Sequence, residues 1–364
     1  MWRRTETSRM SLVPRPARKH ARLPLMMGPL VSQDASDGVP SLATGAPALR
    51  SPGALVVSAM LFAFGFASES AAWDRGGHYL VGAVAWEGMS ESARAESVRL
   101  MLQAPHDSDL PGLWSLEISE PESRARGFFV RAANWADLVK DRGLPDRQAR
   151  YDRFDWHFVN WFWRPTPQGP LYLESRRRFG QLLHQLERLQ QSVVASKRPP
   201  RARGLDVAWI VHLVGDVHQP LHASARVTSE EPDGDRGGND FPLAFGDASN
   251  LHAYWDTALS RGYPRRPDRS LTQWAVETAE ALLQEHPRTD FEEELERVSF
   301  EEWSWYGAQF AMRSAFPPEL VRGGSPPSSY EAMALLESKR RVVLAGYRLA
   351  DKLNQWLGAS REVR

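Results

Sequence analysis

The sequence predicts an all-α fold, built as a single mainly helical domain that begins near residue 73. Apolar residues recur at helical spacing in 182–189 and again in 332–353. Alternating apolar and polar patterns bounded by hairpin turns, which would indicate strands, are hard to find. No internal repeat of fixed period is present. The 364-residue chain is long enough to bury a sizeable core without disulfides.

The composition excludes several classes of protein. The chain has 45 basic and 45 acidic side chains and no cysteine. Charge balance argues against a basic nucleic-acid coat and against an acidic disordered tail protein. The lack of cysteine rules out a disulfide scaffold and any zinc or redox site built on thiolates.

The first 72 residues differ from the rest. They hold eight basic and four acidic side chains, a net of +4, which leaves a net of −4 for residues 73–364. The apolar run 54–67 has 14 residues, whereas a bilayer span needs about 20. Small residues at Ser70 and Ala72 complete the pattern of an export signal cleaved before Trp73. The alternative is a disordered extension with an accidental apolar patch.

We therefore expect three parts: an N-terminal extension with signal peptide at 1–72, the main helical domain at 73–358 and a C-terminal tail at 359–364. The apolar run begins later than in ordinary signals of about 15 to 30 residues, which leaves the translation start open. The signal predicts that the protein is exported.

Segments rich in Pro and Gly predict surface loops, and the run Arg176–Arg178 predicts a solvated helix start. Four histidines that do not cluster with other candidate ligands are expected to be exposed. The predicted loops lie near 164–170, 226–250, 262–268 and 316–328. The four isolated histidines are His20, His106, His184 and His286.

Candidate metal ligands cluster in the segment 208–222. His212 and Asp216 are four residues apart inside an apolar helical run, which places both side chains on one helical face. Pro220 ends that helix, so that the chain can turn His222 toward the same cavity.

The same spacing recurs at His252 and Asp256. One such pair is usually an ion pair, but two pairs in apolar surroundings favour a metal site because a lone buried carboxylate is costly. Imidazole and carboxylate without thiolate suit zinc in a site open to water.

Further motifs complete a family pattern. Gly77-His78 follows Trp73, and Asn134-Trp135-Ala136-Asp137 and His157-Phe158-Val159-Asn160 precede the two His/Asp pairs. From Trp73 to about Leu357 the chain resembles the S1/P1 nucleases. These are zinc-dependent single-strand nucleases and 3′-nucleotidases, related in fold to the bacterial zinc phospholipases C.

The resemblance implies a cleft with three zinc ions. One ion would be held by Asp137, His157, His212 and Asp216, with Asp216 bridging to a second. That second ion would also be held by His78 and by the terminal amine and carbonyl oxygen of Trp73. His222, His252 and Asp256 would hold the third. Only cleavage before Trp73 creates the free amine, which can deprotonate near neutral pH to bind metal.

The resemblance also implies roles in catalysis and substrate binding. Asp137 would orient or deprotonate the attacking water, and Lys140 would neutralise the phosphate as a point charge. Phe158 would stack on a base, and Asn160 would hydrogen-bond its edge. His218 would support the ligands without binding metal. Apart from the resemblance, the segment 223–251 is 29 residues long, which is too long for a plain connector, and we expect it to form the other wall of the cleft.

The expected substrates are single-stranded DNA or RNA and 3′-nucleotides, with 5′-phosphorylated products. We expect a monomer without a stable protein partner. The eukaryotic members of the family are disulfide-bonded and glycosylated, whereas this chain has no cysteine and no Asn-x-Ser/Thr site, so the resemblance implies a bacterial protein that is secreted or periplasmic. Two alternatives stay open at this point: a zinc phospholipase C, in which the last ligand is typically Glu rather than Asp256, and a zinc-binding relative without turnover.

Overall fold

The computed structural model describes residues 73–195, 197–246 and 248–358. The expected signal peptide at 1–72 and the expected tail at 359–364 lie outside these ranges. Within the described residues, no helix combines the length and apolar character that a bilayer span requires.

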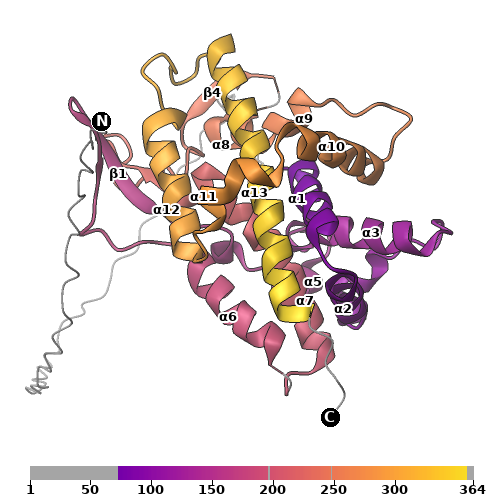
Figure 1. Ribbon diagram of the computed structural model, residues 1–364. Helices are drawn as coiled ribbons and strands as arrows, with labels where there is room; N and C mark the ends of the chain where they lie inside the picture. The colour runs from indigo at the N-terminus through magenta and orange to yellow at the C-terminus, as the bar shows by residue number, and fades with distance from the viewer. Residues whose placement is uncertain (1–72, 196, 247, 359–364) are drawn as a thin grey trace, which may run out of the picture. The chain divides into compact units, whose positions relative to one another are not determined.

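The described chain is mainly helical, as the sequence predicts, with short strands between the helices (Figure 1). The α-helices are α1 (Arg75–Gly88), α2 (Glu91–Leu102), α3 (Pro121–Ala132), α4 (Trp135–Leu138), α5 (Pro145–Tyr151), α6 (Leu182–Val194), α7 (Pro200–His218), α8 (Leu251–Asp256), α9 (Ala258–Gly262), α10 (Leu271–Glu285), α11 (Glu292–Leu295), α12 (Phe300–Phe310) and α13 (Ser328–Leu357). Single turns of 3-10 helix include η3 (Phe154–Trp156) and η4 (Pro220–Ala223).

Helix α7 is enclosed by other helices. It packs against α2, α6, α12 and α13, and every residue from Asp206 to His218 is buried. A helix that is apolar on all sides needs such surroundings. His212 and Asp216 are therefore held in the interior, where their polar atoms need partners.

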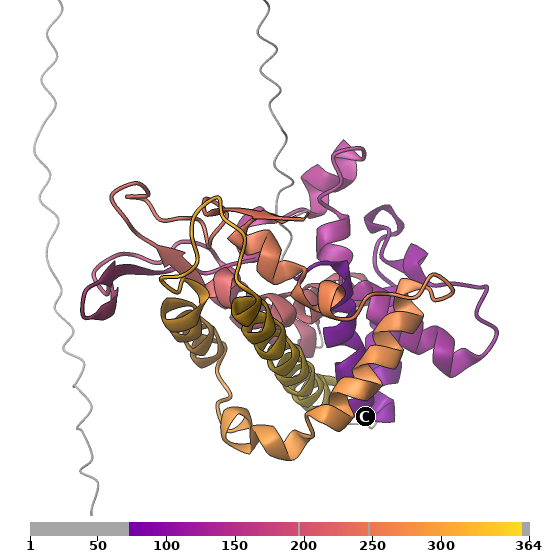
Figure 2. The same ribbon diagram turned by 90° about the horizontal axis from the view of Figure 1, so that it is seen from above.

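Helices α1 and α13 lie against each other near α7, and α10 lies beside α13 (Figure 2). A Cβ atom on Gly346 would come within 2.3 Å of Val84, so only glycine allows this approach of α13 to α1. The contact fixes α1, which carries His78.

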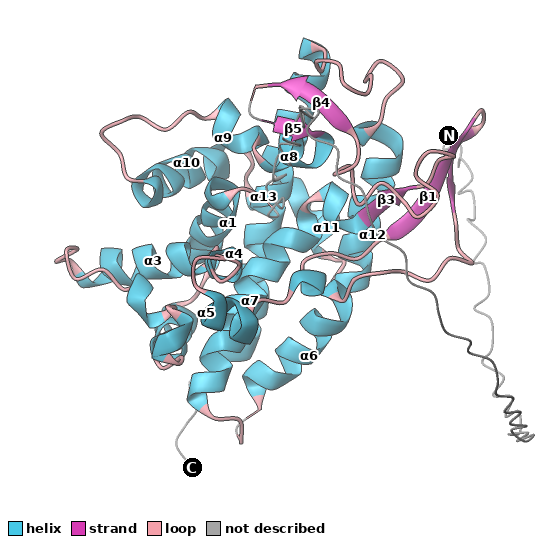
Figure 3. Ribbon diagram, turned by 180° about the vertical axis from the view of Figure 1, so that it is seen from behind, coloured by secondary structure: helices cyan, strands magenta, loops and turns pink. Residues whose placement is uncertain are grey.

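Two small sheets contradict the prediction of plain loops at 164–170 and 226–250. The strands are β1 (Trp161–Thr166), β2 (Gly169–Tyr172), β3 (Ser224–Arg226), β4 (Pro242–Phe245) and β5 (Ala248–Asn250). They are too short, at three to six residues, to show the alternating pattern. The order is β2-β1-β3 in one sheet, with β1 parallel to β3, and β4 pairs with β5 in the other. Figure 3 shows β1 and β3 beside α12, and β4 and β5 beside α8.

The parallel pair β1 and β3 helps to build the site. Trp161 lies opposite Ser224, and the amide of Val159 donates to the carbonyl of His222 at 2.9 Å. The segment that carries His157 and Phe158 is thus joined to the segment that carries His222.

Two other predictions were wrong. His286 is buried rather than exposed, and its carbonyl accepts a hydrogen bond from the Tyr347 hydroxyl. Arg176–Arg178 belongs to an irregular segment between β2 and α6 instead of starting a helix. His106 and His184 are exposed as expected, and His20 lies outside the described residues.

Candidate metal centre

The structure brings the eight predicted side-chain ligands into three groups. Within each group the potential ligand atoms lie within 4.8 Å of one another. The groups are His78, Asp137 and His212; His157, His212 and Asp216; and His222, His252 and Asp256. His212 belongs to two groups, so these two are adjacent.

Helical spacing explains two of the pairs. His212 and Asp216 are one turn apart on α7, with Nε2 and Oδ2 separated by 3.3 Å. His252 and Asp256 repeat this on α8, at 3.7 Å. His222 lies on the turn η4 that follows α7, as the position of Pro220 predicts.

Asp216 faces two groups at once. Its Oδ1 lies 3.4 Å from His78 Nε2, and its Oδ2 lies 2.9 Å from His157 Nδ1. Asp137 approaches the same histidines, with Oδ2 at 3.8 Å from His78 Nε2. A carboxylate with its two oxygens aimed at different imidazoles can bridge two cations.

In the third group, a ring nitrogen of His222 lies close to a ring nitrogen of His252, and a cation between them would make this contact favourable. His222 Nδ1 donates to the His157 carbonyl and His252 Nδ1 donates to the Gly237 carbonyl, both at 2.7 Å. In the neutral rings these bonds place the proton on Nδ1 and leave Nε2 as an acceptor. The two Nε2 atoms nevertheless lie 3.0 Å apart. Two lone pairs repel at this distance, whereas a metal ion would accept both.

Buried polar atoms without hydrogen bonds also fit bound metal. Both ring nitrogens of His78 and Oδ1 of Asp216 are buried and have no hydrogen-bond partner in the part of the chain described. Leaving such atoms unsatisfied costs about 1 to 3 kcal/mol each. The donor set of imidazole and carboxylate is the one that zinc binds in open sites, so these residues fit zinc.

The electrostatic environment favours the metal-binding form of most ligands but not of all. Burial, reinforced by nearby cations, holds the pKa values of His78 and His157 well below their usual range, and burial lowers the pKa of His252 to about 4. For Asp137, burial acts to raise the pKa, but Lys140 and His212 together outweigh it and the pKa is lowered. These shifts favour neutral imidazoles and an ionised carboxylate, which are the ligand forms.

His212 and Asp216 shift the other way. Burial raises the pKa of Asp216 to about 6. Burial acts to lower the pKa of His212, but the carboxylates of Asp216 and Asp137 outweigh it and the pKa is raised.

Trp73 lies next to these groups. Its side chain is fully buried, and its Nε1 donates to the carbonyl of Gly215, the neighbour of Asp216, at 3.1 Å. The amide of Asp74 donates to the carbonyl of Asp256 at 3.0 Å. The indole of Trp73 is thus tied to α7 and the backbone amide that follows Trp73 is tied to α8, and these helices carry ligands of different groups.

The profile of the family described as S1/P1 Nuclease matches residues 73–358. The chain belongs to the S1/P1 nuclease family. Nuclease S1 from Aspergillus oryzae (strain ATCC 42149 / RIB 40) is 24% identical over 135 residues, which are 36% of this chain and 42% of that protein. The chain thus matches less than half the length of this relative. Family membership confirms the resemblance and the mainly helical fold class.

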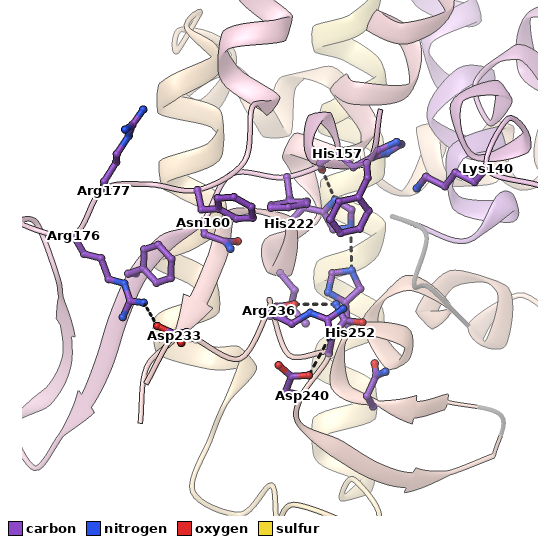
Figure 4. A pocket seen from close by; sticks show the side chains of 18 residues that line it. Lys140, His157, Asn160, Arg176, Arg177, His222, Asp233, Arg236, Asp240 and His252 are labelled. Carbon is purple, nitrogen blue, oxygen red and sulfur yellow. Dashed lines mark hydrogen bonds and ion pairs between the residues drawn. The ribbon is translucent and has the colours of Figure 1, made fainter. Parts of the chain in front are cut away.

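In this S1/P1 family member, a pocket of about 690 Å³ opens beside histidines of the His/Asp groups (Figure 4). Lys140, Phe158 and Asn160 line it, together with His157, His222 and His252. Lys140 Nζ lies 2.7 Å from Asp137 Oδ1, so the predicted cation adjoins the predicted base. Residues of 223–251, including Asp233 and Arg236, line the pocket as well.

Several residues of the site are not evident in the sequence. Gln219 donates from Nε2 to Asp256 Oδ1 at 2.7 Å and so orients a ligand. His218, which the sequence does single out, hydrogen-bonds to the carbonyl of Val214 and to Arg348 and belongs to none of the three groups. Arg176, Arg177 and Phe179 line the pocket, although no motif points to them. Only the closeness of Gln219 to Pro220 and His222 could have drawn attention to it.

Proposed function

We propose that the chain is a zinc-dependent endonuclease that hydrolyses single-stranded DNA or RNA to 5′-phosphorylated products, and that it also removes the phosphate of 3′-nucleotides. The observation that carries the proposal is a pocket lined by Phe158, Lys140 and three histidines of the His/Asp groups, His157, His222 and His252. The family match supports a nuclease.

Three zinc ions would be held by nine residues. Asp137, His157, His212 and Asp216 would hold the first, and His222, His252 and Asp256 would hold the third. The second would be held by Asp216, His78 and the terminal amine and carbonyl of Trp73. Zinc there would lower the pKa of water and offset the charge on the phosphate and leaving oxygen.

The chain's own groups perform the remaining tasks. Asp137, kept ionised by Lys140, accepts a proton from the attacking water and orients it. The Lys140 ammonium, which lies at the pocket surface beside Asp137, offsets the negative charge of the phosphate. Phe158 presents a ring for stacking on a base, worth about 1 to 3 kcal/mol, and Asn160 offers an amide to the base edge.

Export completes the proposal. Cleavage before Trp73 would free the amine that the second zinc needs, and the protein would act in the periplasm or outside the cell. The burial of Trp73 supports this, because the indole of the residue that would become the N-terminus donates to the carbonyl of Gly215, the residue before Asp216.

The test uses zinc-loaded protein that starts at Trp73. Circular single-stranded DNA, a nucleoside 3′-monophosphate and phosphatidylcholine vesicles are offered separately, and an Asp137→Asn variant purified in parallel controls for contaminating nucleases. We expect wild-type protein to open the circle and to release phosphate. Hydrolysis of the lipid alone would show a phospholipase C, and three bound zinc ions without hydrolysis of any substrate would show a non-catalytic relative.

A further inference from the structure

The pocket extends beyond the residues that one nucleotide needs. Figure 4 shows Lys140 beside His157 at one end, and Arg176 and Arg177 at the other, with His222 between them. Phe154 and Phe179 both contact Phe158, with ring centroids 5.5 Å and 5.7 Å from it, and all three line the pocket. A base stacked on Phe158 would leave both flanking rings uncovered.

These flanking rings are exposed although they are apolar. Phe154 is 55% and Phe179 is 58% exposed, and both line the pocket. Exposed aromatic side chains next to a cleft are a common mark of a binding surface. A base can stack on either ring because every base has a π face.

The segment that carries Phe179 is held firmly. The amide of Asn160 donates to the carbonyl of Phe179 at 2.7 Å, and Gln181 donates from its backbone to the carbonyl of Asp155. Gly180, with φ +96°, lies so close to the carbonyl oxygen of Phe158 that a Cβ atom would come within 2.2 Å. Phe179 is therefore fixed relative to Phe158 before any ligand arrives.

The side chains of Arg176 and Arg177 differ in their contacts. Arg176 lies over the ring of Phe162 and donates to the carbonyl of Pro232, so it joins the two walls. Arg177 is exposed, and within the described ranges its guanidinium has no hydrogen bond or ion pair. An unpaired guanidinium in a pocket is suited to a phosphate, because its planar fork matches phosphate oxygens.

We propose that Phe179, Phe154 and Arg177 form a second nucleotide subsite. This subsite binds the nucleotide that neighbours the one stacked on Phe158, on the side of Phe158 away from the His/Asp groups. The base of that nucleotide stacks on the Phe179 ring, and Arg177 binds its phosphate. This inference rests on the proposed function, because it names a further part of the same substrate.

The subsite predicts a difference between substrates. A nucleoside 3′-monophosphate contacts only Phe158 and the His/Asp groups, whereas a thymidine tetranucleotide is long enough to contact Phe179 as well. For Phe179→Ala we expect kcat/KM on the tetranucleotide to fall about tenfold or more while kcat/KM on the monophosphate stays the same. Phe179→Tyr, which keeps a ring, should restore the loss. Arg177→Gln should lower kcat/KM on the tetranucleotide and make its salt dependence shallower.

Two exposed residues outside the pocket lining serve as matched controls. Arg178 pairs with Glu301 and lies over Trp161, and Leu336 is 55% exposed on α13. Arg178→Gln and Leu336→Ala should change neither substrate's kcat/KM.

The outcomes separate the two proposals. If Phe179→Ala and Arg177→Gln lower kcat/KM equally on both substrates, or on neither, the subsite is refuted while the nuclease stands. If wild-type protein hydrolyses neither substrate, the proposed function fails and the subsite fails with it. Thermal melting of each variant shows whether a loss follows from unfolding instead, and a recovered rate in Phe179→Tyr excludes that explanation.

Discussion

Asp216 directs its two carboxylate oxygens toward different histidines, His78 and His157. This is the arrangement that a bridging ligand needs, and it depends on α7 being buried on all sides. A bridging carboxylate cannot be replaced by an amide without weakening both ions that it joins.

We predict that Asp216→Asn binds at least one zinc fewer and loses more than about 100-fold in kcat, because the charge stabilisation by bound metal is worth several kcal/mol. Zinc per chain, measured by mass spectrometry, and phosphate release check this. A variant with full zinc content and wild-type rate would contradict the bridging role. Asp206→Asn, on the same helix but near its other end, serves as the control for folding.

Gln219 is not a candidate metal ligand, but its hydrogen bond to Asp256 is expected to raise the affinity for zinc. Its amide holds Asp256 at 2.7 Å, and Gln219→Met keeps the length of the side chain but loses the amide. We predict an affinity about 10- to 100-fold weaker at the third zinc, measured by competition with a chelator. Unchanged affinity would mean that Asp256 is held well enough by α8 alone.

At the scale of elements, the sequence predicts the long helices well. α6, α7 and α13 appear where the apolar periodicity places them, because each has a face or a whole surface in the core. The strands were missed because Trp161, Phe162 and Trp163 are all buried, which removes the alternating pattern. The eight side-chain ligands could be named from motif spacing, but Arg177 and Phe179 could not, since loop contacts to Phe158 and Asn160 decide their position.

Gly180, in the segment between β2 and α6, is expected to tolerate alanine less well than Gly169. Gly180 and Gly169 both have φ near +100°, but a Cβ atom meets Phe158 at Gly180 and nothing within 4 Å at Gly169. Both alanine variants should lose about 1 to 3 kcal/mol from strain, and Gly180→Ala should lose more because of the clash. Denaturant unfolding measures the difference; equal losses would mean that the two segments can move apart.

At the scale of the whole molecule, the charge balance takes on a different meaning. Residues 73–364 are net acidic, at −4, yet Lys140, Arg177 and Arg236 all line one pocket. In the proposed nuclease, attraction to phosphate would thus be local to the cleft, although Asp233 and Asp240 line the same pocket. A broad basic surface of the kind that grips duplex backbones is not what the sequence provides.

The candidate ligands come from α1, α4, α7, α8 and the turns around His157 and His222, so bound metal would join distant parts of the chain. Ions that bind only the folded chain would stabilise it, and removing them would cost stability at each site. We predict that a chelator lowers the Tm by about 10 °C or more, and that zinc restores the Tm while magnesium, which prefers oxygen ligands, does not. Calorimetry checks this; a Tm independent of chelator would refute a structural contribution of metal.

The most direct test of the account is the zinc content of the purified protein that starts at Trp73, measured per chain by mass spectrometry. The account predicts three zinc ions, and fewer when a residue is added before Trp73, because the added residue removes the free amine. Fewer than three ions in the protein that starts at Trp73, or the same number with and without the added residue, would contradict it.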